Sequence, residues 1–466
     1  MLFHSPAFFV FFAAYFAAHV IIPTRFRLWL IIVGGAVFYA QWNIALTWLP
    51  FLLAFIGWAG AIWISAAPEP PGRKIRLAVT IVALASPLLI FKYTNFIVHQ
   101  VIEPTLGLPE EWREWSLEWP LPLGVSFVTF TMMAYVIDYY HGKYKLEWRP
   151  QMIAAYMVFF PHLIAGPILR PREIIPQLDH PRPALDASFK FPLILFTIGL
   201  AKKAIFANQF AEAVDRVYAL AGSVTAWDYL LAIYGFSAQI YCDFSGYTDM
   251  AIALALMIGV RLPNNFNRPY AAFSVADFWR RWHITLSFWL RDYVYISLGG
   301  NRAGWVRRFS NVMVTMVVGG LWHGANWTFV IWGACHGLFI AVSQLLPTRV
   351  KKAGALRTLS ILVTFHIVTI LWVLFRAPDL ATVGRMLTGP FVSPAGDVVS
   401  FVTANAYTLL LLAVFFVWHP VDSHGRLRFL GQRLSAPILW PAVAMVWALA
   451  VSLSAGSSAK FIYFDF

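Results

Sequence analysis

Apolar stretches of about twenty residues, the length that crosses the hydrocarbon core of a bilayer as one helix, recur from one end of this sequence to the other. The chain is 60% hydrophobic and only 12% charged, whereas soluble globular proteins carry about 25% charged residues. The runs are continuous rather than alternating, which argues against a membrane β-barrel. We therefore predict an all-α, polytopic transmembrane helix bundle, with residues 1–466 forming a single membrane-embedded domain.

The apolar periodicity predicts about 11 to 13 spans, with interfacial or re-entrant helices between some of them. The first run lacks a basic segment before it, so it is interpreted as a retained span and not as a cleaved signal peptide. The expected spans are 6–23, 28–45, 48–66, 77–98, 123–140, 189–207, 229–241, 245–260, 311–345 (two spans), 356–376, 401–418 and 437–455.

The loop charges predict the orientation of the spans. The first, third and fifth connections are basic, the second is uncharged, and the fourth, EPTLGLPEEWREWSLEW, is acidic. Because Lys and Arg gather in cytoplasmic loops, the N-terminus is expected outside the cell. The same rule accounts for the net charge of +13, so no nucleic-acid partner is expected. The basic residues are Arg25 and Arg27, then Arg73, Lys74 and Arg76, then Lys143, Lys145 and Arg149.

Two segments interrupt the pattern of spans. Residues 151–177 are short of a full span and broken by prolines, which favours a re-entrant or interfacial hairpin. Residues 260–311 are rich in Arg and aromatic side chains. Within them, residues 274–297 are predicted to form one interfacial helix at the inner leaflet, with Ser274 as its N-cap.

The stretch GGLWHGANWTFVIWGACHG, residues 319–337, places two histidines in an apolar run. In a single helix His336 would lie roughly 20 Å beyond His323 along the axis, so only one of them is expected to be chemical. Ionisable groups inside membranes are costly and usually mark a pathway or a site. His323, crowded by Gly319, Gly320 and Gly324, is the stronger candidate, although a neutral imidazole bonded between helices is the competing interpretation.

Other polar residues support both functional and structural interpretations. His283 is the one imidazole in the Arg-rich helix, where membrane anchoring explains the Arg and Trp residues but not the histidine. His162, in the proposed re-entrant turn, suits a structural cap or a site equally well. Asp243 and Asp249 flank a Ser-Gly kink at a span boundary and could cap the following helix, an interpretation favoured for Asp249. The two cysteines have no metal-ligand spacing, so no metal site is predicted.

Five sequence blocks, given at the end of this paragraph, together resemble the membrane-bound O-acyltransferase family. The resemblance is to its bacterial polysaccharide branch in particular, typified by alginate O-acetylation membrane subunits. The blocks cover about the middle third of the chain and follow in the family's order. One departure is Cys335, where relatives often have an aromatic residue. The blocks are FFPHLIAGPILR (159–170), YCDFSGYTDMAI (241–252), NFNRPY (265–270), DFWRRWHITLSFWLRDYVYISLGGNR (277–302) and the stretch 319–337.

The resemblance implies a funnel-like bundle with catalytic residues at His323 and His283. An imidazole, with a reference pKa of about 6.5, suits a base that takes a proton from a hydroxyl at neutral pH. His323 is expected to be that base, and His283 to orient it or to bind the thioester side. Asn326 is a candidate donor to the developing oxyanion. The expected substrate-binding residues are Asn326, Trp322, Arg280, Arg281, Arg291 and His162.

By the same resemblance, no cofactor is bound and the acyl donor is acetyl-coenzyme A, with a carrier-protein thioester as the alternative. The Arg residues would steer the phosphates of coenzyme A, although positive-inside topology explains each of them as well. The expected partners are an extracytoplasmic SGNH-type acetyltransferase and a polysaccharide acceptor: alginate, cellulose, another exopolysaccharide or peptidoglycan. The alternative functions are a transporter or flippase that uses the histidines as a proton relay, and a non-catalytic scaffold.

Overall fold

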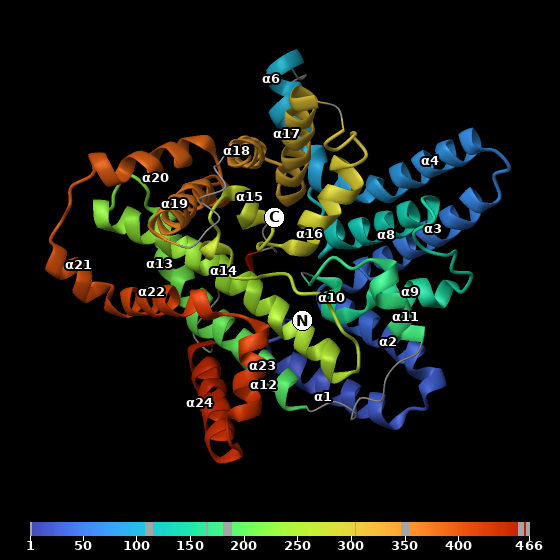
Figure 1. The fold of residues 1–466 in the computed structure, drawn as a ribbon, viewed down its shortest axis with the longest axis horizontal. Helices are drawn as coiled ribbons and strands as arrows, with labels where there is room; N and C mark the ends of the chain where they lie inside the picture. The colour runs from blue at the N-terminus through green and yellow to red at the C-terminus, as the bar shows by residue number, and fades with distance from the viewer. Residues whose placement is uncertain are drawn as a thin grey trace. The chain divides into compact units, whose positions relative to one another are not determined.

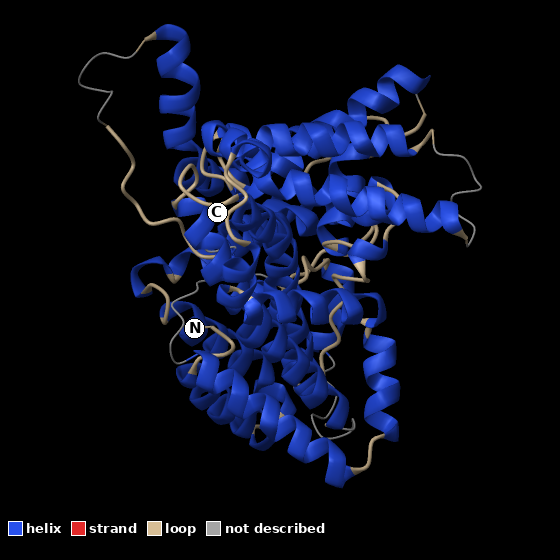
Figure 2. Ribbon diagram, turned by 90° about the vertical axis from the view of Figure 1, so that its left-hand side faces the viewer, coloured by secondary structure: helices blue, strands red, loops and turns tan. Residues whose placement is uncertain are grey.

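The structure is a computed structural model, and it describes residues 2–107, 115–164, 166–179, 189–302, 304–345, 354–454 and 461–462. Within these residues every regular element is a helix, and the elements are joined by loops and turns (Figure 2). The predicted all-α class is therefore confirmed. Part of the acidic fourth connection, residues 108–114, lies outside the described residues.

The chain divides into two compact units, the first formed by Met1–Pro192 with Ala251–Pro263 and the second by Leu193–Met250 with Asn264–Phe466. In the first unit α3, α4 and α8 pack against one another, and α9 packs on α2 and α3 (Figure 1). Its elements are α1 (Pro6–Ile21), α2 (Thr24–Ala40), η1 (Ile44–Leu46), α3 (Trp48–Ser65), α4 (Pro70–Leu88), η2 (Leu89–Tyr93), α5 (Thr94–Phe96), η3 (Ile97–Ile102), α6 (Glu103–Leu106), α8 (Val125–Tyr140), α9 (Pro150–Val158), α10 (Phe160–Leu163) and α11 (Pro171–Asp179).

In the second unit α17 and α18 form the most extensive helix pair, and α18 packs in turn on α15 and α19. The long helix α14 contributes its first part to this unit and its last turns to the first unit. The elements are α12 (Lys190–Ala201), η4 (Lys202–Ala207), α13 (Asn208–Ala219), α14 (Ala226–Met257), η5 (Pro269–Ala271), α15 (Val275–Trp279), α16 (Ile284–Trp289), η6 (Leu290–Tyr295), α17 (Gly304–His323), α18 (Trp327–Ser343), α19 (Ala355–Arg376), α20 (Leu380–Val392), α21 (Val398–Ala404), α22 (Ala406–Trp418), η8 (His419–Val421), α23 (His424–Arg433) and α24 (Ala436–Ser454).

Five helical stretches in the described residues are long and apolar enough to cross a membrane, and a sixth is a pair bent by 77°. All six coincide with predicted spans, although the predicted span 401–418 is broken at Asn405. Other predicted spans correspond to shorter helices, such as α1 with 16 residues and α18 with 17, so the total of 11 to 13 stays a prediction. The six are Ile44–Ser65, Pro70–Leu106, Lys190–Ala219, Ala355–Arg376, Ala436–Leu453, and Val398–Ala404 with Ala406–Val421.

Two predicted boundaries are wrong. The spans 229–241 and 245–260 form one continuous helix, α14, of 32 residues. The Ser245–Gly246 pair does not break it, because Gly246 serves packing: a Cβ there would lie 2.7 Å from the carbonyl oxygen of Gly199. Conversely, the predicted helix 274–297 breaks after Trp279. Ser274 is its N-cap as expected, since its Oγ accepts from the N–H of Asp277 at 3.1 Å.

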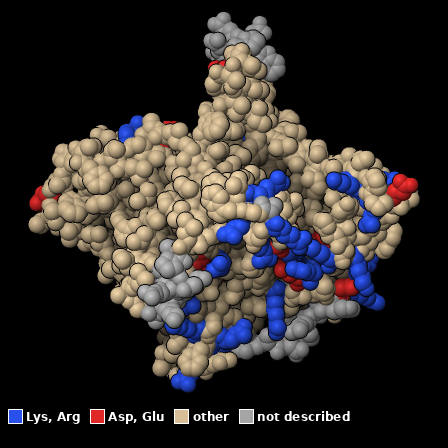
Figure 3. Space-filling view, turned by 45° about the horizontal axis from the view of Figure 1, so that its top comes forward, with Lys and Arg blue, Asp and Glu red and all other residues tan. Residues whose placement is uncertain are grey.

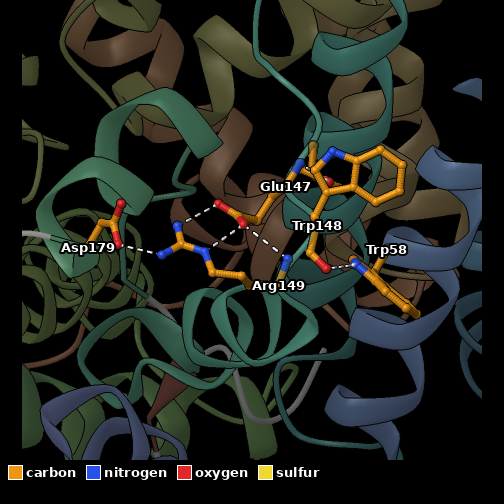
Figure 4. Close-up of polar contacts among 6 residues, drawn as sticks. Trp58, Glu147, Trp148, Arg149 and Asp179 are labelled. Carbon is orange, nitrogen blue, oxygen red and sulfur yellow. Dashed lines mark hydrogen bonds and ion pairs between the residues drawn. The ribbon is translucent and has the colours of Figure 1, made fainter. Parts of the chain in front are cut away.

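The segment 151–177 forms α9, α10 and the start of α11, of 9, 4 and 9 residues. None of the three is long enough to span a bilayer, as expected. The start of α9 is fixed by Arg149, which donates to Glu147 at 2.8 Å and to Asp179 at 2.7 Å (Figure 4). The indole of Trp58 donates to the carbonyl of Trp148 at 3.3 Å. Arg149 is therefore neutralised by two carboxylates.

The described surface exposes many large apolar side chains, among them Ile21 at 79% and Phe391 at 86%. In the view of Figure 3, Lys and Arg side chains gather on part of the face and most of the rest is neither acidic nor basic. Large exposed apolar areas of this kind mark contact with lipid or with a partner. They fit the membrane class that the composition predicts.

Candidate active site

A helix break places His323. Helix α17 ends at His323 and α18 begins at Trp327, so the predicted segment 311–345 forms two helices, whereas its two membrane spans stay a prediction. Asn326 makes the restart possible, because its Oδ1 accepts from the backbone N–H of Thr328 at 3.0 Å and caps α18. Its amide nitrogen donates to the carbonyl of Pro378 at 2.8 Å. Asn326 is thus engaged in the turn, and its predicted oxyanion role would depend on its second amide N–H.

Close packing of α17 on α18 fixes the position of His323 relative to α18. A Cβ at Gly320 would lie 2.2 Å from the carbonyl oxygen of Phe329, and one at Gly333 would lie 2.3 Å from that of Met316. Both distances are shorter than any real Cβ contact, so the two backbones meet where each side chain is a hydrogen atom. Small residues allow this approach between membrane helices.

The His323 ring lies in an aromatic setting and is only 2% exposed. Its centroid is 4.8 Å from that of Trp322, 5.2 Å from Trp332 on α18 and 5.1 Å from Phe375 on α19, each edge to face. The base hypothesis requires that a substrate reach this ring. In this structure a hydroxyl reaches it only after one of the surrounding side chains moves.

His283 occupies the break between α15 and α16 and is fully buried. Its φ of 42° lies in the left-handed region, which a side chain other than glycine rarely adopts. Asn265 holds this turn: its backbone carbonyl accepts from the N–H of Ile284 at 3.0 Å, and its Oδ1 accepts from the N–H of Thr285 at 3.1 Å. His283 Nδ1 lies 3.2 Å from the same Oδ1.

Trp322 contacts both histidines. Its ring centroid is 5.8 Å from that of His283 and 4.8 Å from that of His323. On its other side, the His283 ring meets Phe244 of α14 at 4.8 Å. The structure therefore brings three of the predicted residues, His283, Trp322 and His323, into one buried cluster. The pKa of His283, which lies outside the six candidate spans, is lowered by burial, and this favours the neutral ring.

Arg280 and Arg281 lie in the turn between α15 and α16, and Arg291 lies in η6. Arg280 and Arg291 are exposed, whereas Arg281 is half-buried. Arg281 donates to Asp277 at 3.0 Å, and Arg291 donates to Asp292 at 2.6 Å. Arg280 and Arg291 are open to an anion from solvent, although Arg291, like Arg281, already has a carboxylate partner.

Two other histidines singled out in the sequence, His162 and His336, lie within hydrogen-bond distance of buried groups. His162 belongs to the first unit, where its Nε2 lies 3.0 Å from the carbonyl oxygen of Tyr156. His336 is fully buried on α18 and accepts from the indole N–H of Trp279 at 3.2 Å. The bond from Trp279 agrees with the expectation that His336 is structural, and the predicted substrate-binding role of His162 stays a prediction.

A buried ionic network was not anticipated from the sequence. Lys202, in the π-helical turn η4, lies 2.7 Å from both Asp249 and Asp422. Lys203 lies 2.7 Å from Asp243, and His424 lies 2.7 Å from Asp249. Asp243 and Asp249 sit inside α14 and are not helix caps, because α14 continues past the predicted boundary. Their spacing from Lys202 and Lys203 along the chain gave no signal of pairing.

Among the described residues, no group of three or more His, Cys, Asp or Glu is arranged to hold a metal ion. The histidine cluster and Asn326 carry imidazole and amide groups, which can accept a proton and donate a hydrogen bond, and the rings around His323 can exclude water.

Comparison with known proteins places this cluster in a family context. The family model described as "MBOAT, membrane-bound O-acyltransferase family" matches residues 147–377, a range that contains His283, Trp322 and His323. The chain is 37% identical over 440 residues to the probable alginate O-acetylase of Azotobacter vinelandii, covering 93% of this chain and 87% of that relative.

Two further relatives carry related names. The chain is 38% identical over 400 residues to the probable alginate O-acetylase of Pseudomonas aeruginosa, covering 84% of this chain and 75% of the relative. It is 33% identical over 428 residues to the peptidoglycan O-acetyltransferase of Helicobacter pylori, covering 84% of this chain and 79% of the relative. Both similarities extend well beyond the histidine cluster, over most of the chain.

Proposed function

Because this chain belongs to the membrane-bound O-acyltransferase family, and is thus a multi-pass membrane enzyme that transfers acyl groups to hydroxyls, we propose that it acetylates an extracytoplasmic polysaccharide. The acetyl group would come from a cytoplasmic thioester and cross the bacterial inner membrane within the enzyme. The single observation that carries the proposal is the buried cluster in which His283 and His323 contact the same Trp322 ring.

In the proposed reaction His323 takes the proton from the acceptor hydroxyl as its oxygen attacks the thioester carbonyl. The carbon–oxygen bond forms, the carbon–sulfur bond breaks, and the proton passes from the imidazole to the leaving thiolate. A positioned base contributes about 10²–10⁴-fold, and holding both substrates in a dry site contributes the rest. His283 either orients this base or contacts the thioester. The second amide N–H of Asn326 would meet the oxyanion.

The burial of His323 adds a requirement to this scheme. Substrates would enter as one of the aromatic side chains around it moves aside, and the same rings would then exclude water, which competes with the alcohol for the thioester. Trp322, which borders both histidines, is the side chain whose movement would open the cluster to both substrates.

The proposed donor is acetyl-coenzyme A, and a carrier-protein thioester is the alternative. The exposed Arg280 and Arg291 suit the phosphates of coenzyme A. The proposed acceptor is an uronic-acid polymer such as alginate, because two relatives are named probable alginate O-acetylases. Peptidoglycan is the alternative, on the name of the third. A separate SGNH-type transferase would complete the transfer outside, and the N-terminus would lie on that side.

The test measures ester-linked acetyl in envelope polysaccharide by mass spectrometry, in a deletion strain that carries wild-type, His323→Ala or His366→Ala protein. His366 is a matched control, because it is exposed on α19 and its Nδ1 bonds the carbonyl of Leu362 in its own helix. We expect background acetyl with His323→Ala and wild-type acetyl with His366→Ala, at equal protein levels. Unchanged acetyl content in both the deletion strain and the His323→Ala strain would contradict the proposal.

A further inference from the structure

Asn265 is placed to decide which nitrogen of His283 carries the proton. Its side-chain Oδ1 has three neighbouring donors: the backbone N–H of Thr285 at 3.1 Å, the hydroxyl of Thr285 at 2.9 Å and Nδ1 of His283 at 3.2 Å. The side chain is 1% exposed. Its amide nitrogen has no hydrogen-bond partner among the described residues, so the described contacts at Oδ1 hold it in place.

The orientation of the Asn265 amide follows from the backbone. Oxygen and nitrogen of an amide are assigned from their hydrogen bonds, and here the Thr285 backbone N–H can only donate. If the amide were flipped, its NH₂ group would face that N–H, donor against donor, in a buried place. The oxygen must therefore face Thr285, and it faces His283 Nδ1 as well.

A carbonyl oxygen has lone pairs and no hydrogen, so the contact at 3.2 Å is a hydrogen bond only if Nδ1 carries the proton. In a neutral imidazole, one nitrogen then donates and the other accepts. With the proton on Nδ1, Nε2 of His283 carries a lone pair and no hydrogen, so it can accept a hydrogen bond and cannot donate one.

We propose that Asn265 is a positioning residue that fixes the proton of His283 on Nδ1, so that His283 serves the reaction as a hydrogen-bond acceptor through Nε2. This rests on the proposed acyltransferase function and deepens it, because it selects between the two roles left open for His283. A donor to the thioester carbonyl is excluded for the neutral ring. The remaining role is that of a hydrogen-bond acceptor: Nε2 of His283 accepts either from the hydroxyl of the substrate alcohol or from an N–H of His323.

The left-handed backbone at His283 supports this assignment. Such a conformation is strained for a residue other than glycine and persists where the surroundings hold it. The bonds from Ile284 and Thr285 to Asn265 hold it here. Glycine at position 283 would start α16 with less backbone strain. The observed turn instead has a histidine there, and its imidazole faces Asn265.

Several charged and titratable groups lie on the elements around His283 and contribute to any pH dependence of its protonation. Its own segment carries Asp277 paired with Arg281, and Asp292 paired with Arg291. Loop 264–268, α14 and α17 pack against it, through Asn265, Phe244 and Trp322. These elements bring Arg268 in the loop, Asp243 and Asp249 on α14, and Arg307, Arg308 and His323 on α17.

The decisive variant is Asn265→Asp. Aspartate keeps an acceptor for the Thr285 N–H, so the cap and the fold survive, but it puts a carboxylate against Nδ1–H. An opposite charge this close raises an imidazole pKa by about 1–3 units. If His283 must be a neutral acceptor, the acid limb of the activity–pH profile moves up by about that amount. If Asn265 only caps α16, the limb stays where it is in wild type.

The assay uses full-length protein in lipid nanodiscs, with release of coenzyme A from acetyl-coenzyme A in the presence of oligomannuronate, from acid pH up to pH 9. We expect the acid limb of Asn265→Asp to lie about 1–3 pH units above that of wild type, and the variant to keep at least half of the wild-type rate at pH 9. Asn265→Leu, with neither bond, should lose at least tenfold at every pH. Asn43→Asp is the matched control, since Asn43 caps η1 by accepting from Ala45 at 2.9 Å and no histidine is among its described contacts. Its acid limb should not move.

A second measurement does not depend on activity. In protein labelled with ¹⁵N-histidine, the NMR signals that disappear in His283→Gln should report a protonated Nδ1 and an unprotonated Nε2. A protonated Nε2 with a bare Nδ1, or an unshifted acid limb in Asn265→Asp, overturns the inference even if wild-type protein is active. Wild-type protein that releases no coenzyme A, with the expected NMR signals, would overturn the proposed function and leave the assignment of Asn265 standing.

Discussion

Substituting Gly320 by alanine separates the position of His323 from the stability of the fold. The new Cβ would lie 2.2 Å from the carbonyl oxygen of Phe329, and real Cβ contacts begin near 3.0 Å. Helices α17 and α18 must therefore separate by the difference, about 0.8 Å. His323 is three residues further along α17, and its ring rests on Trp332 of α18 at 5.2 Å. The separation of the helices therefore displaces the His323 ring, the proposed base, relative to α18.

The magnitudes differ for stability and for activity. Overpacking costs about 1–3 kcal/mol, and replacing glycine by alanine inside a helix returns about 1 kcal/mol. The net loss of stability is thus about 0–2 kcal/mol, which most folded proteins tolerate. A displacement of about 1 Å at a reacting centre can cost 10²-fold in rate. We therefore expect Gly320→Ala to accumulate near wild-type levels and to lose about 10²-fold in acetyl transfer per folded molecule.

The assay is coenzyme A release by nanodisc protein, normalised to the monodisperse fraction in size-exclusion chromatography. Gly333→Ala, whose Cβ would lie 2.3 Å from the Met316 carbonyl oxygen, should behave like Gly320→Ala. Gly384→Ala on α20 is the control, because nothing lies within 4 Å of its added Cβ. If Gly320→Ala turned over as fast as Gly384→Ala, the packing of α17 on α18 would not set the position of the base, and the reasoning would be refuted.

Two further predictions concern charged residues away from the histidines. Lys202→Met leaves Asp249 and Asp422 without their buried lysine partner, and breaking such a pair costs about 3–5 kcal/mol. The thermal midpoint of the variant in detergent should therefore fall sharply, whereas Lys145→Met, at an exposed position, should leave the midpoint unchanged. Equal midpoints for the two variants would contradict a structural role of the network. Burial acts to raise the pKa of Glu147, but the hydrogen bonds from Arg149 outweigh it and the pKa is lowered, so its contribution to stability is present above the unfolded pKa of about 4.3 and is lost as the pH falls through the folded value. Thermal melts of Glu147→Gln should therefore lie below wild type at pH 7 and converge with it below about pH 4, and a gap that persists in acid would show that the ion pair is not its cause.

Much of the architecture was determined by the sequence alone. Apolar runs of membrane-spanning length have few alternatives to a helix, because a backbone in lipid must satisfy its own hydrogen bonds. The predicted spans that pass the length and composition test coincide with helices for that reason. The clustering of His283, Trp322 and His323 was expected only through the family resemblance, since no local rule brings positions forty residues apart together.

Only the tertiary structure decided where helices break and what buried polar atoms contact. The helix breaks at His283 because Asn265, in an earlier loop, accepts hydrogen bonds from the N–H groups of Ile284 and Thr285. It does not break at Gly246, because that glycine faces Gly199. Composition and periodicity describe a residue by its neighbours along the chain. A hydrogen bond or a close backbone contact between distant segments depends on how the elements pack, and that is where the tautomer of His283 and the position of His323 are set.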